Sequence, residues 1–234
     1  MFMSNGFRSF DLGRDELCKK LGGGFPPGSI AVIEGGSGSG KSTVCQRVAY
    51  GLMENGISVT YVSTQLTTKG FINQMYSLNY KIAHFLLKKK LLYIPVLSLM
   101  DPTPSRLDFI ERLRAGKELY DSDVIIIDTL SSLIKHSANV EKSLELISFF
   151  KRLTGIKKTI ILAIEPSELQ SNILSELVGA CDINLYLKVS TLGSSIKRTI
   201  IVNKFTGAAA SVESMIGFRI ESNVGLVVEI ASVS

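Results

Sequence analysis

The sequence predicts an α/β fold, in which a mostly parallel sheet flanked by helices continues into antiparallel C-terminal β-hairpin strands. Three observations support this fold class. Apolar runs alternate with helical patterns up to residue 180, a glycine-rich phosphate-binding pattern follows the first apolar run at residues 35–42, and beyond Cys181 apolar runs succeed one another through short turns. With 234 residues, 45% of them hydrophobic, the chain can bury a full core, and we expect residues 1–234 to form a single α/β domain.

The N-terminal half is expected to hold three strands among its helices. Residues 14–20 fit a short helix, and 21–29 contain too much glycine and proline for either regular element. Val44, Val48 and Leu52 recur at helical spacing. The predicted elements are, in order, a strand over 29–34, a helix over 42–55, a strand over 58–63, helices over 71–78 and 82–87, a strand over 91–95 and, after a loop at 101–105, a helix through 107–113.

The C-terminal half changes its pattern at Cys181. Before this residue, the uninterrupted β-branched run 124–127 predicts a strand that is covered on both faces. After it, the turn residues Gly193-Ser194 and 223–225 predict hairpins, whose strands extend the sheet in antiparallel fashion. The predicted elements are a strand over 124–127, a helix over 140–150, a strand over 159–163, a helix over 169–178, and strands over 183–189, 196–205, 216–220 and 226–230.

The glycine-rich stretch at 35–42 fits G-x-x-x-x-G-K-[ST], the phosphate-binding P-loop (Walker A). Glycine is needed because the backbone N–H groups must approach a phosphate closely. Lys41 would supply charge to the β- and γ-phosphates, Ser42 would offer its hydroxyl to Mg²⁺, and the helix that begins there would add its positive end. A glycine/serine linker could match by chance, but it would not explain the strand before and the helix after. The expected ATP-binding residues are Gly35, Gly36, Ser37, Gly38, Ser39, Gly40, Lys41, Ser42 and Thr43.

The chemistry of a P-loop enzyme also needs a carboxylate near Mg²⁺ and a base for water. Asp128 ends the buried run 124–127 and fits the first role, so Ser42 and Asp128 are the expected metal ligands. The base is most often a Glu at the end of the strand beside the Walker strand, where this chain reads Tyr-Val-Ser-Thr-Gln at 61–65. Glu165 could act as a substitute base, although a turn carboxylate is the simpler interpretation.

Four features together resemble the RecA/KaiC superfamily of ATPases over residues 15–230: the glycine- and proline-rich stretch 21–29, the P-loop, the segment 128–133 and the hairpin strands after Cys181. This resemblance implies a RecA-like P-loop core. Members carry their catalytic Glu in a pattern similar to Tyr-Ile-Asp-Thr-Glu, and Gln65 falls on that position. Since an amide can orient a water but cannot take its proton, the resemblance makes enzymatic activity uncertain.

The KaiC branch carries a Lys-Leu-Arg-Gly-Thr segment that reaches the ATP of the neighbouring subunit, and residues 203–207 resemble it. Lys204 is kept and would contact ATP, but Thr206 stands at the arginine position. An arginine finger contributes about 10³ to 10⁵ in rate. Because this chain has neither that arginine nor the catalytic Glu, the resemblance implies slow ATP hydrolysis at most. Binding of ATP with Mg²⁺ is expected to persist.

Within the superfamily, the chain most resembles the nucleotide-binding subunits of the archaeal flagellum (archaellum) motor. These carry Ser-Thr-Glu-Leu-Thr-Thr after the second strand, where residues 63–68 read Ser-Thr-Gln-Leu-Thr-Thr. The resemblance implies a regulatory or scaffold subunit of a motility machine. It also implies a homo-oligomeric ring at the cytoplasmic face of the cell membrane, with the motor ATPase FlaI and the membrane platform FlaJ as partners.

Bulk properties leave some alternatives open. No run reaches the roughly 18 apolar residues of a spanning helix, and three widely spaced cysteines favour a reducing cytoplasm. The net charge of +5 would suit nucleic acid, yet the segments 131–139 and 165–179, which would read DNA in a recombinase, hold only Lys135 and His136 and no aromatic residue. A RecA-paralogue ATPase acting as a DNA-repair accessory remains an alternative, as does a KaiC-like autokinase with Ser63, Thr64 or Thr67 near the γ-phosphate.

Overall fold

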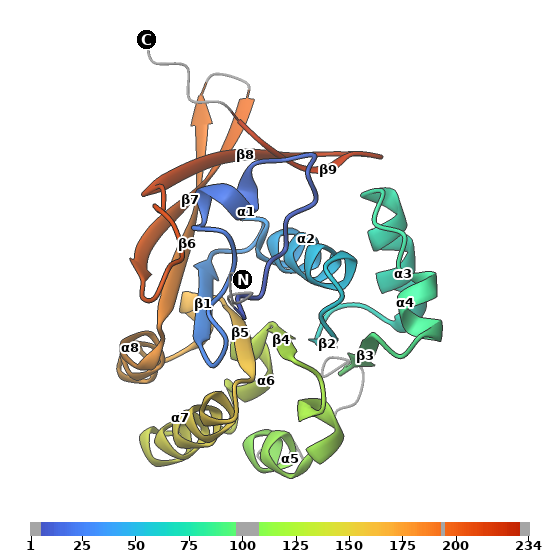
Figure 1. The fold of residues 1–234 in the computed structure, drawn as a ribbon. Helices are drawn as coiled ribbons and strands as arrows, with labels where there is room; N and C mark the ends of the chain where they lie inside the picture. The colour runs from blue at the N-terminus through green and yellow to red at the C-terminus, as the bar shows by residue number, and fades with distance from the viewer. Residues whose placement is uncertain (1–5, 97–107, 193–194, 230–234) are drawn as a thin grey trace.

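The computed structural model describes residues 6–96, 108–192 and 195–229, and over these residues the strands form one nine-stranded sheet with helices on both faces (Figure 1). The strand order is β3-β2-β4-β5-β1-β6-β7-β8-β9. In chain order the strands are β1 (Ile30–Gly35), β2 (Val59–Ser63), β3 (Leu91–Pro95), β4 (Val124–Asp128), β5 (Thr159–Ile164), β6 (Ile183–Leu192), β7 (Ser195–Phe205), β8 (Met215–Glu221) and β9 (Gly225–Val228).

The pairing confirms the mixed sheet with one adjustment. Strands β1 to β5 pair in parallel, and β6 also pairs in parallel with β1 along its first half. Antiparallel pairing therefore begins at β7, one strand later than the change in sequence pattern suggests. The turn between β8 and β9 was predicted correctly, with Asn223 and Gly225 both at positive φ, whereas Gly193 and Ser194 lie outside the described residues.

The helices agree with the sequence pattern except at two places. The predicted helix over 14–20 is reduced to four residues, because the Asp15 carboxylate accepts the N–H of Leu17 at 3.0 Å and the chain bends before it. A short helix at 130–134 was not predicted. The loop at 101–105 and residue 107 lie outside the described residues. The helices are α1 (Leu17–Lys20), α2 (Lys41–Glu54), α3 (Thr68–Ser77), α4 (Ala83–Leu87), α5 (Phe109–Ala115), α6 (Leu130–Ile134), α7 (Val140–Gly155) and α8 (Ser171–Ala180), with 3₁₀ turns η2 (Lys117–Tyr120) and η3 (Pro166–Glu168).

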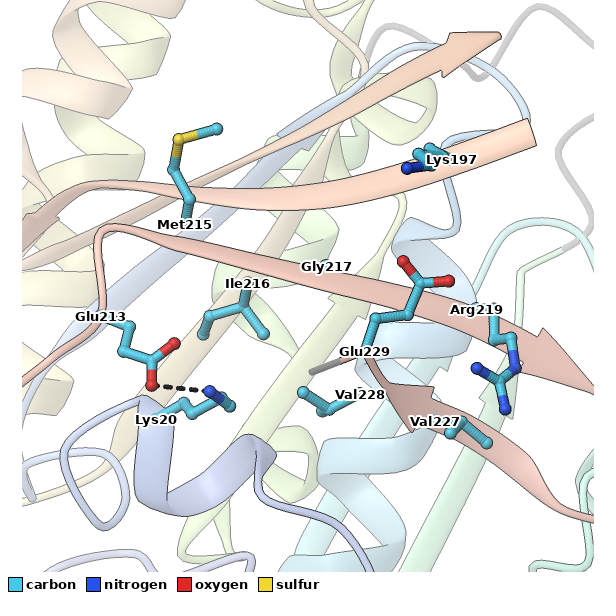
Figure 2. Close-up of a pocket in the computed structure, with 10 residues that line it drawn as sticks. All are labelled: Lys20, Lys197, Glu213, Met215, Ile216, Gly217, Arg219, Val227, Val228 and Glu229. Atoms are coloured by element: carbon cyan, nitrogen blue, oxygen red, sulfur yellow. Dashed lines mark hydrogen bonds and ion pairs between the residues drawn. The ribbon is translucent and has the colours of Figure 1, made fainter. Parts of the chain in front are cut away.

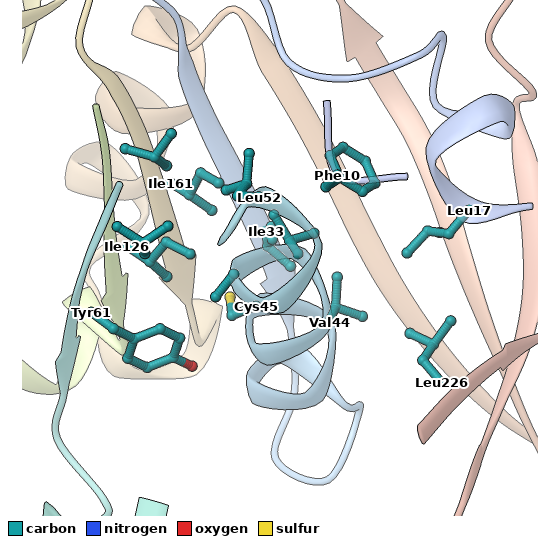
Figure 3. Close-up of a cluster of buried hydrophobic side chains, with 14 of the residues drawn as sticks. Phe10, Leu17, Ile33, Val44, Cys45, Leu52, Tyr61, Ile126, Ile161 and Leu226 are labelled. Carbon is teal, nitrogen blue, oxygen red and sulfur yellow. The ribbon is translucent and has the colours of Figure 1, made fainter. Parts of the chain in front are cut away.

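Two apolar cores lie on opposite faces of the sheet. Along β1, Ala31 and Ile33 pack toward α2, whereas Ile30 and Val32 pack with α7 and α8 on the other face. Figure 3 shows the first core, in which α2 side chains contact those of several strands. Burial on both faces explains why the central strands are unbroken apolar runs rather than alternating ones.

The N-terminal lead-in, residues 10–15, is joined to α2 by a buried ion pair. Arg47 is fully buried and donates from Nε and Nη2 to both carboxylate oxygens of Asp15, at 2.7 and 2.8 Å. Its Nη1 donates to the carbonyl of Phe10 at 2.9 Å. Because every charge in this group is paired, the lead-in can pack against the helix that carries the P-loop without leaving a buried charge unsatisfied.

The parallel arrangement brings several chain segments to one edge of the sheet. Ser63 at the end of β2 pairs with Asp128 at the end of β4, and Glu34 on β1 pairs with Ile164 on β5. The residues that follow these strands therefore surround the start of α2. No helix in the described ranges combines the length and apolar character needed to cross a bilayer.

Candidate nucleotide-binding site

The P-loop connects β1 to α2 and lines a cavity of about 270 Å³. Two of its glycines adopt left-handed conformations, Gly38 at φ 73° and Gly40 at φ 98°, which side chains rarely tolerate. The loop therefore needs the glycines of the motif, and the helix start at Lys41 directs its N-terminal N–H groups toward the cavity. The cavity is lined by Ser37, Gly38, Gly40, Lys41, Ser42, Thr43, Gln65, Glu165 and Ile220.

Lys41 is nearly buried and its ammonium is fully engaged. It donates to the carbonyls of Gly35 at 2.7 Å and Gly36 at 2.9 Å, and it lies 3.4 Å from the carboxylate of Glu165. These three acceptors fix the ammonium inside the P-loop cavity. A lysine held in this way places a localised positive charge at the cavity, and its contact with a phosphate stays a prediction.

Asp128 is only 4% exposed and lies beside Ser42. Its Oδ1 accepts a hydrogen bond from the Ser42 hydroxyl at 3.0 Å, and its Oδ2 accepts one from the Tyr61 phenol at 2.7 Å. Burial raises the pKa of Asp128, while the hydrogen bonds from Tyr61 and Ser42 and the charge of Lys41 act in the opposite direction. A hydroxyl and a carboxylate in contact at the P-loop are the oxygen donors that Mg²⁺ prefers, so the residues present fit this metal.

The two candidate bases lie in the same cavity as the P-loop. Gln65 follows β2, and its exposed side chain contributes to the cavity wall. Glu165 follows β5, and its backbone N–H donates to the hydroxyl of Ser131 at 2.9 Å. The carboxylate of Glu165 thus contacts the site through Lys41 rather than only closing a turn. A catalytic role for either residue stays a prediction.

Lys204 lies apart from the cavity of its own chain. Strand β6 pairs with β1 on one side and with β7 on the other. Its Leu187 lies beside Gly35, at the P-loop end of β1, whereas Lys204 of β7 pairs with Asn184, nearer the start of β1. Its ammonium donates to the backbone carbonyl of Cys181. A contact of Lys204 with the ATP of a neighbouring subunit stays a prediction.

The hydroxyls of the autokinase alternative each have a structural partner. Ser63 and Thr64 are both 2% exposed. Ser63 accepts the N–H of Leu66 at 3.3 Å, and Thr64 accepts the N–H of Thr129 at 3.2 Å. Thr67 caps α3 by accepting the N–H of Gly70 at 3.0 Å. These contacts favour the interpretation that the three hydroxyls hold the backbone in place.

Sequence reasoning missed two residues of the site. Ile220 reaches the cavity from β8, far along the chain, and no local pattern indicates this. Tyr61 could have been found, because the two-residue period of a strand places Tyr61 and Ser63 on one face, and Ser63 pairs with Asp128.

A larger cavity of about 780 Å³ lies beside the C-terminal strands (Figure 2). An ion pair between Lys20 and Glu213, at 2.6 Å, joins α1 to the residues before β8 at its edge. None of the P-loop residues, Asp128 or Gln65 lines it. The smaller cavity is therefore the candidate site because of its chemistry rather than its size.

Comparisons with known proteins agree with this geometry. A family model described as "ATPase: KaiC" matches residues 12–232. The archaeal flagellar ATP-binding protein FlaH of Methanocaldococcus jannaschii is 43% identical over 224 residues, 96% of each chain, and that of Methanococcus voltae is 36% identical over 97% of this chain and 99% of its own.

Solved structures give the same result. The crystal structure of flagellar accessory protein FlaH from M. jannaschii matches with a TM-score of 0.89 and 41% identity, over 96% of this chain and 100% of that chain. A KaiC-like protein from Pyrococcus horikoshii, at 19% identity, shares the fold with a TM-score of 0.74 over 96% of this chain and 100% of its own. The resemblance noted from the sequence is thereby confirmed, and the chain belongs to the KaiC family of ATPases and, within it, to the archaeal flagellar FlaH proteins.

Proposed function

We propose that this chain is an ATP-binding regulatory or scaffold subunit of the archaeal flagellum motor, which binds ATP with Mg²⁺ and hydrolyses it slowly at most. The observation that supports this most directly is that Lys41 and Ser42 line the P-loop cavity and that Ser42 donates a hydrogen bond to the carboxylate of Asp128 behind it. The printed description of the relatives, a flagellar ATP-binding protein, points the same way.

Binding would use the backbone N–H groups of the P-loop and the start of α2 for the phosphates, with Lys41 as their cationic partner. Mg²⁺, when bound, would neutralise charge on the phosphate oxygens. Ser42 and Asp128 would hold the metal on the protein side, directly or through water. The side chain of Ile220 offers an apolar contact at the cavity wall.

Slow hydrolysis follows from the groups that face the cavity. Gln65 can orient a water through its amide but cannot accept the proton. General-base assistance typically contributes about 10² to 10⁴ in rate, so its loss leaves mainly positioning and charge stabilisation. Among the described residues that line the cavity, Glu165 carries the one carboxylate, and it is already engaged in an ion pair with Lys41 at 3.4 Å.

A long-lived ATP complex suits a protein whose task is assembly. In this proposal residues 1–234 act as one domain, copies of the chain form a ring, and Lys204 contributes to the ATP site of the next copy. The ring would lie at the cytoplasmic face of the membrane, held there by the motor ATPase FlaI and the platform FlaJ. ATP bound between subunits would stabilise the ring by mass action.

The decisive experiment is size-exclusion chromatography with light scattering, without nucleotide, with ADP and with ATP·Mg²⁺, while phosphate release is measured on the same samples. We expect a larger mass with ATP·Mg²⁺ and very little phosphate. Lys41→Ala should lose ATP binding and the change in mass together. An unchanged dissociation constant in Lys41→Ala would show that the site is assigned wrongly, and one mass under all conditions would contradict ATP-dependent assembly.

A further inference from the structure

The carboxylate of Asp128 accepts hydrogen bonds from three hydroxyls, and the longest of them, at 3.4 Å, comes from the adjacent Thr129 to Oδ1. Ser42 donates to Oδ1 from the start of α2, and Tyr61 donates to Oδ2 from the middle of β2. Only Ser42 belongs to the P-loop motif. The phenol of Tyr61 is fully buried, so its hydrogen bond is shielded from competing water.

An aromatic cluster fixes the Tyr61 ring. Its centroid lies 5.0 Å from that of Phe71 and 6.1 Å from that of Tyr93, and the Phe71 and Tyr93 rings stack at 4.1 Å. Tyr93 in turn donates its hydroxyl to the carbonyl of Leu66 at 2.7 Å. The Tyr61 hydroxyl therefore cannot follow Asp128 if the carboxylate rotates.

We propose that Tyr61 is the positioning residue for the metal-facing carboxylate of Asp128. By engaging Oδ2, the phenol holds the carboxylate plane so that Oδ1 faces Ser42, where Mg²⁺ would be shared with the phosphates. A ligand that is already oriented loses less conformational freedom when the metal binds, and removal of such outer partners typically costs about 10- to 100-fold in metal affinity. This inference rests on the proposed binding of ATP with Mg²⁺.

Tyr61→Phe removes the hydroxyl and keeps the ring, and two variants serve as matched controls. Tyr93→Phe removes a hydroxyl from the same cluster, but one that bonds Leu66. Tyr80→Phe removes a buried hydroxyl that accepts the N–H of Leu226 at 3.0 Å, with no contact to Asp128. Thermal unfolding of all three variants identifies any general loss of stability.

Nucleotide affinity is measured in EDTA and across a Mg²⁺ titration. In Tyr61→Phe we expect the nucleotide affinity in EDTA to stay within about twofold of wild type. The Mg²⁺ concentration that produces half of the full change in nucleotide affinity should rise about tenfold. Both controls should keep the wild-type Mg²⁺ dependence. An unchanged Mg²⁺ dependence in Tyr61→Phe, or the same shift in Tyr80→Phe, would overturn the proposal. A wild type that binds nucleotide equally well with and without Mg²⁺ would instead contradict the proposed function itself.

A spectroscopic signature tests the same contact even if Tyr61→Phe is too unstable to assay. The chain contains no tryptophan, so its near-ultraviolet protein absorption comes mainly from tyrosine. Because Asp128 would hold Mg²⁺ in the nucleotide complex, its carboxylate would have less electron density to share, and the hydrogen bond from the Tyr61 phenol would weaken. We expect a tyrosine difference spectrum in wild type, Tyr93→Phe and Tyr80→Phe. Its absence from a wild type that binds Mg²⁺ with nucleotide would refute the role of Tyr61.

Discussion

The ammonium of Lys41 lies 3.4 Å from the carboxylate of Glu165, inside the cavity that the P-loop lines. Lys41 begins α2 and Glu165 follows β5, and they meet because β1 and β5 are parallel neighbours. A phosphate bound by Lys41 must share the ammonium with this carboxylate. We therefore expect Glu165 to influence nucleotide affinity whether or not it takes part in hydrolysis.

Glu165→Gln removes the negative charge from the cavity and should raise the affinity for ATP. A partly exposed ion pair is worth about 0.2–1 kcal/mol, so we expect a gain of about two- to fivefold in a calorimetric titration. Glu176→Gln, on the exposed side of α8, changes the net charge equally and should have no effect. Weaker binding in Glu165→Gln would mean that the carboxylate orients Lys41 rather than competing for it.

The central strands and the P-loop could be predicted because their determinants are local. The run before Asp128 is apolar at every position, as a strand buried on both faces requires, and the motif glycines need no distant partner. The helix α6 escaped prediction because its five residues are too few to show a helical period.

Contacts between distant segments could not be predicted from one sequence. The burial of Arg47 depends on Asp15 and Phe10, which lie 32 and 37 residues earlier, and nothing in the α2 pattern distinguishes this arginine from a solvated one. The position of Lys204 depends on the register between β6 and β7. Residue types alone indicate which side chains can perform the chemistry, whereas the register decides which of them meet.

Gly51→Ala provides a test in which packing opposes helix propensity. In the interior of α2 alanine should be favoured by about 1 kcal/mol over glycine. A Cβ at this position, however, would lie 2.2 Å from the carbonyl oxygen of Phe10 and 2.6 Å from Nη1 of Arg47. We expect a loss of about 1–3 kcal/mol in the free energy of unfolding, measured by urea denaturation.

Gly179→Ala is the matched control for this substitution. Gly179 lies in α8, and a Cβ there would meet no atom within 4 Å. The control should be neutral or stabilising by up to about 1 kcal/mol. Equal effects of the two substitutions would mean that the lead-in does not pack against α2 as described.

The hydrogen bonds of Glu168 lead us to expect that the free energy of unfolding depends on pH. It accepts hydrogen bonds from Ser131 at 2.8 Å, from Ser132 at 2.7 Å and from Lys135 at 2.9 Å. Partial burial acts to raise the pKa of Glu168, but the three donors together outweigh it and lower this pKa below 4.5. Because the folded pKa is the lower one, the stabilisation is complete above the unfolded value and is lost as pH falls through the folded value.

Glu168→Gln should accordingly lower the free energy of unfolding by about 1–2 kcal/mol at pH 7. The difference from wild type should shrink as the pH of the urea titration falls below about 4.5. Glu176→Gln again serves as the control, since an exposed glutamate should show neither effect. A difference that stays constant down to pH 3 would mean that the ionised form of Glu168 is not the stabilising one.

The last prediction concerns the amide of Gln65, which lies in the wall of the P-loop cavity. With positioning by the P-loop but no base at this place, wild-type turnover should be far below the usual range of about 1 to 10³ s⁻¹. Gln65→Glu restores a proton acceptor of nearly the same shape, and we expect phosphate release to rise at least about tenfold. ATP affinity, measured separately, should change by no more than about fivefold.

Gln65→Ala separates the effect of a base from that of a side chain that merely fills space. This variant should hydrolyse ATP no faster than wild type, because it can neither hold a water nor accept a proton. Lys41→Ala gives the background of the phosphate assay. If wild type already turned over several ATP per second, or if Gln65→Glu were no faster, the base would have to lie elsewhere. Glu165 would then be the first residue to substitute, since it carries the one carboxylate among the described residues that line the cavity.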